Sequence, residues 1–290
     1  EQGIIAQEIR MYQDSPGWRV LFELLGCLYE HSPVKIDIAG TEESIAQITP
    51  ELLYTCYNTF YNPGNMVLAI AGNFDPDEAL AIIEQNLVER ETVEIERAPY
   101  QERKEALRPR ADLTMDVAQP QFYIGFKQRP AETEAAFLRQ QFELEILHEL
   151  LIGSTSACYE KLLRAGIINS TFGTEVFSGR GFLVSLFGGE SEQPEAVQKA
   201  LCEEIDRVMR EGIDREDFLA CKNAIYGRML RTLHDVEDAA TALLGAEMSG
   251  LGLFESIGML AAVTPEDVTR RLRTDFDTSC MAISVIHPRG

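Results

Sequence analysis

The sequence predicts an α+β protein with two homologous domains, each an antiparallel or mixed sheet covered by helices, the first of them truncated. Three observations support this prediction. The chain has 290 residues, enough for about two domains at roughly 150 residues each. Strand-like apolar runs and helical patterns fall in separate stretches instead of alternating. Two distant segments also repeat one another.

The composition is that of an ordinary globular protein with an unusual charge. Hydrophobic residues make up 45% and charged residues 25%, which excludes a disordered or low-complexity chain. Asp and Glu number 47 against 26 Lys and Arg, so the formal net charge is −21. Such a chain repels phosphate backbones and anionic lipid, and we therefore expect neither nucleic acid nor a membrane as a partner.

Cysteine usage and the absence of apolar runs point to a cytoplasmic protein. No stretch approaches the roughly 18 apolar residues of a membrane span, and no leader-like segment opens the sequence. The six cysteines form no Cys-x-x-Cys pair, and several fall within helical patterns, as buried reduced thiols do; a cysteine metal or redox site is the minor alternative. The first residue is Glu1 and not Met, which suggests that the sequence is part of a longer protein.

Residues 1–88 are predicted to be mostly helical with one strand, and we assign them to the C-terminal part of the first domain. A turn-rich segment lies around Ser32–Thr41, and Met66–Ala71 is predicted to be a buried strand. The predicted helices are Glu1–Asp14, Trp18–His31, Pro50–Tyr61 and Asp75–Leu87.

Residues 89–110 are densely charged, contain Pro99 and Pro109, and are predicted to be an exposed linker. Residues 111–290 form the second predicted domain. Its predicted strands are Leu113–Val117, Gln121–Lys127, Thr171–Phe177, Phe182–Phe187 and Met281–Ile286. Its predicted helices are Thr133–Ile152, Ser156–Arg164, Pro194–Glu211, Arg215–His234, Val236–Met248 and Thr264–Asp275.

The repeat joins the ends of the two domains. Thr-Pro-Glu occurs at residues 49–51 and 264–266, and Met66 and Met281 are separated by the same 215 positions, with no gap between these anchors. In both places a helix leads into an apolar strand, which indicates two copies of one domain.

A further match, Glu-Ser-Ile at residues 43–45 and 255–257, is shifted by three positions. We call residues 1–71 copy one and residues 113–286 copy two. Copy one is then shorter by roughly 100 residues, all from its front. We therefore expect this chain to be a C-terminal piece of a longer protein, or to begin inside its first domain.

A pair of glutamates in the first helix is the most informative chemical feature. At about 100° per residue, Glu1 and Glu8 fall two turns apart in the middle of the apolar side. A buried carboxylate has to be paired, hydrogen-bonded, protonated or bound to a metal. The helical wheel alone favours a salt bridge to Arg or Lys and leaves a metal or acid–base role open. A catalytic zinc needs about three protein ligands, and no His-x-x-His or His-x-x-Glu-His occurs among the four histidines.

The same segment resembles a known family. Glu1-x-x-Ile-x-x-x-Glu8-Ile-Arg-Met-Tyr, His31-Ser-Pro-Val and Asp37-Ile-Ala-Gly-Thr-x-Glu-Ser-Ile are similar to the region downstream of the zinc motif in insulinase/pitrilysin-type zinc peptidases, also called inverzincins. The bacterial two-domain members that act as paired subunits are the most similar. The resemblance is strong over residues 1–72 and weaker over the second domain, where it includes Pro120-Gln-Phe-Tyr-Ile-Gly-Phe.

The resemblance implies a zinc metallopeptidase that cleaves peptides or proteins through a zinc-activated water. In this family two histidines of a His-x-x-Glu-His helix and a downstream glutamate hold the zinc. The resemblance implies that Glu8 is that zinc ligand and that Glu1 supports the zinc ligands without binding the metal itself. Both histidines and the glutamate that activates water would lie upstream. The chain would then contain no catalytic residue, and we expect it to be inactive and without tightly bound zinc when alone.

The second domain departs from the family pattern. Many relatives carry there an Arg, and seven residues later a Tyr, that contact substrate. Aligning Gly-Ile-Ile at residues 166–168 with the family's Gly-Leu-Ala puts Leu162 and Asn169 at those positions, and Arg164 is a weaker, shifted substitute. The resemblance therefore implies a zinc-carrying subunit whose homologous partner carries the Arg/Tyr pair, or else a homodimer. The alternative is a non-catalytic scaffold or partner subunit of the same family.

A second possible metal motif lies on the long helix of the second domain. Glu145-x-x-His148-Glu149 is similar to half of a di-iron motif, but no second copy occurs. The repeat puts this helix where copy one would carry its zinc helix. We therefore interpret it as a degenerate relic without metal.

Overall fold

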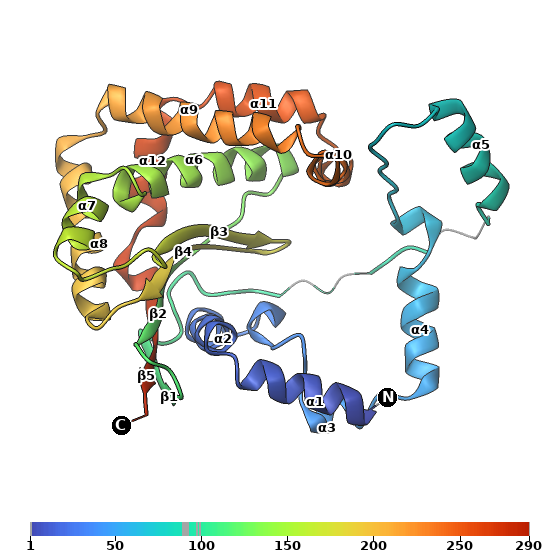
Figure 1. Ribbon diagram of the computed structural model, residues 1–290, viewed down its shortest axis with the longest axis horizontal. Coiled ribbons are helices and arrows are strands. Elements are labelled where there is room, and N and C mark those ends of the chain that lie inside the picture. The colour runs from blue at the N-terminus through green and yellow to red at the C-terminus, as the bar shows by residue number, and fades with distance from the viewer. Residues whose placement is uncertain (1, 89–92, 97, 99, 290) are drawn as a thin grey trace.

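The computed structural model describes residues 2–88, 93–96, 98 and 100–289, and its centre is a five-stranded mixed sheet (Figure 1). The strand order is β1-β5-β2-β4-β3. β1 runs parallel to β5, and the other neighbours are antiparallel, which confirms the predicted α+β class. The strands are β1 (Arg110–Met115), β2 (Gln121–Gln128), β3 (Gly173–Gly179), β4 (Phe182–Glu190) and β5 (Met281–Pro288).

A layer of helices covers one face of the sheet. α6 lies across the middle of this layer and is buried along most of its length. Its apolar side chains share one core with Phe126 of β2, Phe187 of β4 and Ile283 of β5. The helices of this part of the chain are α6 (Glu134–Ile152), α7 (Ala157–Arg164), α8 (Pro194–Glu211), α9 (Arg215–Thr232), α10 (Val236–Ser249), α11 (Leu253–Ala261) and α12 (Pro265–Asp275). The sequence did not predict α11.

The opposite face of the sheet is covered by a helix from the other end of the chain. α2 (Pro16–Leu28) packs on β5, β2 and β1, and its Leu24 and Leu28 share a core with Val184 and Ala282. The approach is close, because a Cβ at Gly125 of β2 would lie 2.8 Å from a methyl carbon of Leu24. Part of copy one thus shields the sheet of copy two.

The remaining elements of the first 88 residues extend away from this sheet (Figure 1). They are α1 (Gln2–Gln13), which packs on α2, followed by η1 (Pro33–Lys35), α3 (Glu42–Ile45), α4 (Pro50–Phe60), η2 (Pro63–Asn65) and α5 (Pro76–Asn86). The predicted strand Met66–Ala71 is wrong for this structure, because the segment forms no ladder with any described strand. An extended segment becomes a strand only when a neighbour accepts its backbone hydrogen bonds.

One helix and one short 3-10 helix of copy one agree in local structure with their equivalents in copy two. α4 and α12 have bounds that are 215 positions apart, and so do η2 and η3 (Thr278–Cys280). Thr49 and Thr264 each cap their helix by accepting a hydrogen bond from the backbone N–H three residues on, and Pro follows at the first turn. The repeat predicted from the sequence is therefore confirmed, and Met66 occupies the position at which β5 begins.

The charged segment before β1 contacts the folded part of the chain. Among its described residues, Arg108 donates its backbone N–H to the carbonyl of Cys27, and Ala106 donates to the carbonyl of Ser279. The carboxylate of Glu102 is largely enclosed. Residues 100–108 consequently contact α2 and the second domain, although most of them are exposed, as expected of the charged linker.

In the described part of the chain, no individual helix is long and apolar enough to cross a membrane. Only α10 and α11 taken together, a pair bent by 84°, have the length and composition of a membrane span.

Candidate functional site

Glu8, the predicted zinc ligand, lies on α1 with its side chain exposed. The helix packs through Ile9, which is buried, while Ile4 and Met11 on the same predicted apolar side are exposed. Glu8 itself is exposed although its neighbour Ile9 is buried, so the prediction that Glu8 is buried is wrong for this structure. Its neighbour Arg10 forms an ion pair with Glu42, 2.9 Å away, and not with Glu8.

Glu1, which was predicted to support the zinc ligands, lies outside the described residues. Over residues 2–88, 93–96, 98 and 100–289, no group of three or more His, Cys, Asp or Glu side chains could hold a metal ion. A catalytic zinc needs about three protein ligands. The Glu8 carboxylate fits zinc as a donor type, but the described residues cannot complete a zinc site.

The two positions at which the family's Arg and Tyr were expected carry residues that contribute to local packing and hydrogen bonding. Leu162 of α7 is buried in the main core. Asn169 follows α7 and organises a loop: its side-chain oxygen accepts hydrogen bonds from the backbone N–H and the hydroxyl of Thr171, and its amide donates to Glu190 at 3.2 Å. Arg164 is exposed and paired with Glu160. Leu162 is therefore enclosed, and the side-chain polar atoms of Asn169 are engaged within its loop.

The Glu145, His148 and Glu149 side chains of α6 do not converge. His148 is buried, and its ring centroid lies 4.7 Å from that of Phe187. Burial lowers its pKa to about 3, and its Nε2 atom has no hydrogen-bond partner among the described residues. Glu149 pairs instead with Arg228 at 2.8 Å. Burial also raises the pKa of Glu145. Among the described residues, His148 is therefore a residue of the hydrophobic core.

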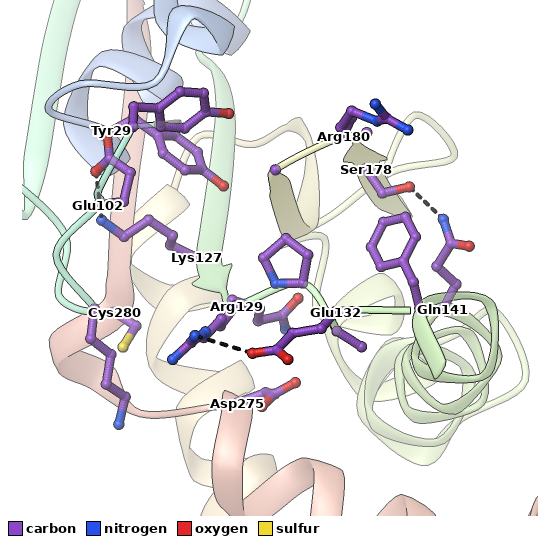
Figure 2. A pocket seen from close by; sticks show the side chains of 18 of the residues that line it. Tyr29, Glu102, Lys127, Arg129, Glu132, Gln141, Ser178, Arg180, Asp275 and Cys280 are labelled. Atoms are coloured by element: carbon purple, nitrogen blue, oxygen red, sulfur yellow. Dashed lines mark hydrogen bonds and ion pairs between the residues drawn. The ribbon is translucent and has the colours of Figure 1, made fainter. Parts of the chain in front are cut away.

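A cavity with a volume of about 1280 Å³ lies between several segments of the described residues (Figure 2). Residues 100–104, the end of β2 with the following turn, the β3–β4 hairpin and the start of α6 all line it. Basic side chains contributed by several of these segments face it, among them Lys127, Arg129 and Arg180. Acidic side chains are interspersed, including Glu102, Glu132 and Asp275.

A buried ion pair forms one wall of this cavity. Lys127 is 3% exposed; its Nζ atom donates to the carbonyl oxygen of Leu28 at 2.7 Å and lies 3.6 Å from the Glu102 carboxylate. Burial lowers the pKa of Lys127, an effect that Glu102 opposes. Burial raises the pKa of Glu102, but backbone N–H groups of residues 30–32 and the Lys127 ammonium outweigh it, so this pKa is below its usual value. The pair connects β2, residues 100–104 and the end of α2.

The opposite wall carries polar side chains that are suited to binding. Gln141 donates a hydrogen bond of 2.6 Å to Ser178, and Arg129 lies 3.7 Å from Glu132 across the turn after β2 (Figure 2). Burial raises the pKa of the Cys280 thiol, which keeps it protonated. No nucleophile paired with a base lines this cavity among the described residues.

Neither Lys127 nor Glu102 was predicted from the sequence to be a buried, paired residue. Lys127 ends an apolar strand, and a charged residue in that position is a signal for a buried partner. Glu102 could not be recognised as that partner, because it stands among many charged residues that are exposed.

Comparison with known proteins places the chain in a family. The family profile described as "Peptidase M16 inactive domain" matches residues 47–225. The "Uncharacterized zinc protease YmfH" of Bacillus subtilis is 31% identical over 294 residues, a match that covers 100% of this chain and 68% of that protein. This chain belongs to the M16 peptidase family.

Solved M16 structures agree with this membership. The chain is 34% identical to a putative M16-like peptidase from Alicyclobacillus acidocaldarius, with a TM-score of 0.95 over 99% of this chain and 70% of that one. A protease from Helicobacter pylori has the same fold, with a TM-score of 0.83 at 17% identity. A Mycobacterium leprae zinc protease is matched over 61% of its length, so the M16 relatives extend well beyond the part that this chain matches.

Proposed function

We propose that this chain is part of a zinc-dependent M16 peptidase that cleaves peptides, and that Glu8 is one of the zinc ligands. Zinc, when bound, would polarise the scissile carbonyl and activate water. The observation that carries the proposal is the Glu8 carboxylate itself: it stands in the segment whose motifs resemble the zinc-peptidase family and is exposed, without an ion pair or hydrogen bond to any described residue. A carboxylate held in a salt bridge would not be available to a metal.

The matched experiment compares two glutamates in the protein made from its complete coding sequence, assayed with its partner. Glu8→Gln removes the anionic ligand at nearly constant size, and we expect zinc content and peptide cleavage to fall at least about tenfold, since even residues that only support zinc ligands commonly cost 10–100-fold. Glu84→Gln, an equally exposed helical glutamate, is the control. Unchanged zinc content in the Glu8 variant would show that the assignment is wrong.

We also propose that a homologous subunit supplies the substrate-contacting Arg and Tyr. The burial of Leu162 and the loop contacts of Asn169 support this, because neither side chain is available to substrate. Mixing the purified protein with its homologous subunit should raise peptide cleavage, and light scattering should show a 1:1 complex. Full activity of a homodimer would contradict the proposal.

A cytoplasmic location remains part of the proposal. All six cysteines are free thiols in the structure, as a reducing compartment allows. Fractionation of cells that express the complete protein tests this: enrichment in the soluble intracellular fraction is expected, and recovery from the extracytoplasmic fraction would contradict it.

One observation favours a second candidate function, a non-catalytic subunit of an M16 complex. The matching profile is the one named for the inactive domain. Reading the coding sequence upstream of Glu1 separates the two candidates. His-x-x-Glu-His in that region supports the peptidase, whereas its absence supports the non-catalytic subunit.

A further inference from the structure

Residues 30–45, which we call the arm, run from the end of α2 back to α1. η1, near the start of the arm, contacts α2. Further along, Asp37 accepts a hydrogen bond of 2.9 Å from the indole N–H of Trp18, near the beginning of the same helix. α3, at the end of the arm, contacts α1. The arm therefore connects α2, which is fixed on the sheet of the second domain, with the helix that carries Glu8.

The far end of the arm contacts α1 before and after Glu8 in the sequence. The side-chain amide of Gln2 donates a hydrogen bond of 3.4 Å to the carbonyl oxygen of Ile45, and Arg10 lies 2.9 Å from the carboxylate of Glu42. The ion pair is exposed, and such pairs are individually weak. These contacts cannot pull the arm into place, so the position of α1 depends on where the arm lies.

The near end of the arm is held by Glu102. One oxygen of its carboxylate accepts the backbone N–H groups of His31 and Ser32 at 2.5 and 2.6 Å, and the other accepts that of Glu30 at 3.2 Å. Hydrogen bonds to an ionised carboxylate are among the stronger ones in proteins. Three of them, from consecutive residues, fix the direction in which the chain leaves α2.

Glu102 is in turn fixed to the second domain. Figure 2 shows Lys127 of β2 reaching toward its carboxylate, and the two charged groups lie 3.6 Å apart. The side chains of Glu102 and Lys127 are 14% and 3% exposed, so water screens this pair less than an exposed one. Lys127 also donates to the carbonyl oxygen of Leu28, the last residue of α2. A continuous series of contacts thus leads from β2 through Glu102 and the arm to α1.

We propose that Glu102 is a positioning residue for the zinc site. By fixing residues 30–32 against the second domain, it sets the place of α1 and with it that of the Glu8 carboxylate. This inference rests on the proposed role of Glu8 as a zinc ligand. Metal–ligand distances vary by only about 0.2 Å, so a small displacement of α1 that leaves the fold intact would weaken zinc binding. Glu102 acts through the arm and is not itself a metal ligand.

Hydrogen exchange and zinc affinity, measured in the protein made from its complete coding sequence, test the positioning role. Glu102→Gln keeps the size of the side chain, but an amide has one accepting oxygen, so its NH2 group would face the Glu30 N–H or the Lys127 ammonium. We expect amide exchange in residues 2–13 to become about tenfold faster, the factor expected for loss of a hydrogen bond to a charged group. The zinc dissociation constant, measured by competition with a chelator, should rise at least about tenfold.

Glu143→Gln is the matched control. Glu143 is also a buried carboxylate, 1% exposed and paired with Arg139 and Arg271, but it lies on α6 and does not contact the arm. This variant should lower the resistance to urea and leave zinc affinity and exchange in residues 2–13 unchanged. If the Glu102 variant behaves in the same way, Glu102 contributes to stability alone and the proposal is overturned.

Two further variants complete the test. If Glu102→Gln does not fold, as judged by exchange in β2, Trp18→Phe removes the bond to Asp37 in the middle of the arm and should give smaller changes of the same sign. Glu8→Gln separates the two proposals. If it weakens zinc binding and Glu102→Gln does not, only the positioning role is wrong. If Glu8→Gln leaves zinc binding unchanged, the ligand assignment is wrong and the positioning role fails with it.

Discussion

At the scale of single residues, two carboxylates have contrasting surroundings: Glu8 is exposed on α1, whereas Glu102 is largely enclosed. The wheel correctly placed Glu8 on a helix, but amphipathicity alone does not show that something covers the apolar side, and in this structure Glu8 is exposed. For Glu102 the sequence was misleading in the opposite direction. Its charged neighbours predicted exposure, whereas three backbone N–H groups and Lys127 hold it against the second domain.

His148 should make the protein sensitive to acid. Burial holds its pKa near 3, well below the roughly 6.5 of an unfolded chain, so the neutral form is favoured in the native state. Its contribution to stability is complete above pH 6.5 and falls as the pH drops from there toward 3. The loss at pH 5 is about 2 kcal/mol. Urea unfolding of His148→Phe between pH 7 and 5 should show a correspondingly flatter pH profile, and a slope equal to that of the unmodified protein would contradict the assignment.

Removing the Lys127 ammonium should destabilise the fold. Lys127→Met keeps the length of the side chain but leaves the Leu28 carbonyl without its donor and the Glu102 carboxylate without its cation. We expect the free energy of unfolding to fall by about 2–4 kcal/mol. Adding Glu102→Gln should cost less in the Lys127→Met background than alone, and strictly additive effects in urea titrations would mean that the two side chains do not interact.

At the scale of elements, the sequence predicted helices well because their signals are local. Thr49 and Thr264, each followed by Pro, mark two helix starts that the structure confirms. Met66–Ala71 shows the limit of such signals. Its apolar pattern matches that of β5, but a strand also needs neighbours, and these are properties of the whole fold.

The contact between α2 and the sheet predicts a specific steric effect. Gly125→Val would put atoms within van der Waals contact of Leu24 and Leu28, forcing α2 away from β2. We expect a loss of about 1–3 kcal/mol. Gly173→Val is the matched control, since Gly173 also lies in a strand and a Cβ there meets nothing within 4 Å. Equal thermal stability of the two variants would show that α2 tolerates displacement.

At the scale of the whole molecule, no group of the described residues could hold a metal ion, although the family relatives are named zinc proteases. We expect the 290-residue chain, purified alone, to contain less than about 0.1 zinc per molecule, since catalytic sites need about three protein ligands. Elemental analysis after dialysis measures this, and one tightly held zinc per chain would contradict the expectation.

The crossing of α2 onto a sheet formed much later in the sequence also has a consequence during synthesis. Tyr29, which follows α2, donates its hydroxyl to the carbonyl of Leu183, a partner 154 residues further on. At 5–20 residues per second, a ribosome needs roughly 10–30 s to deliver that partner. For this time the apolar side of α2 has no native surface to cover. Nascent chains that carry α2 should therefore be targets for chaperones until β4 has emerged.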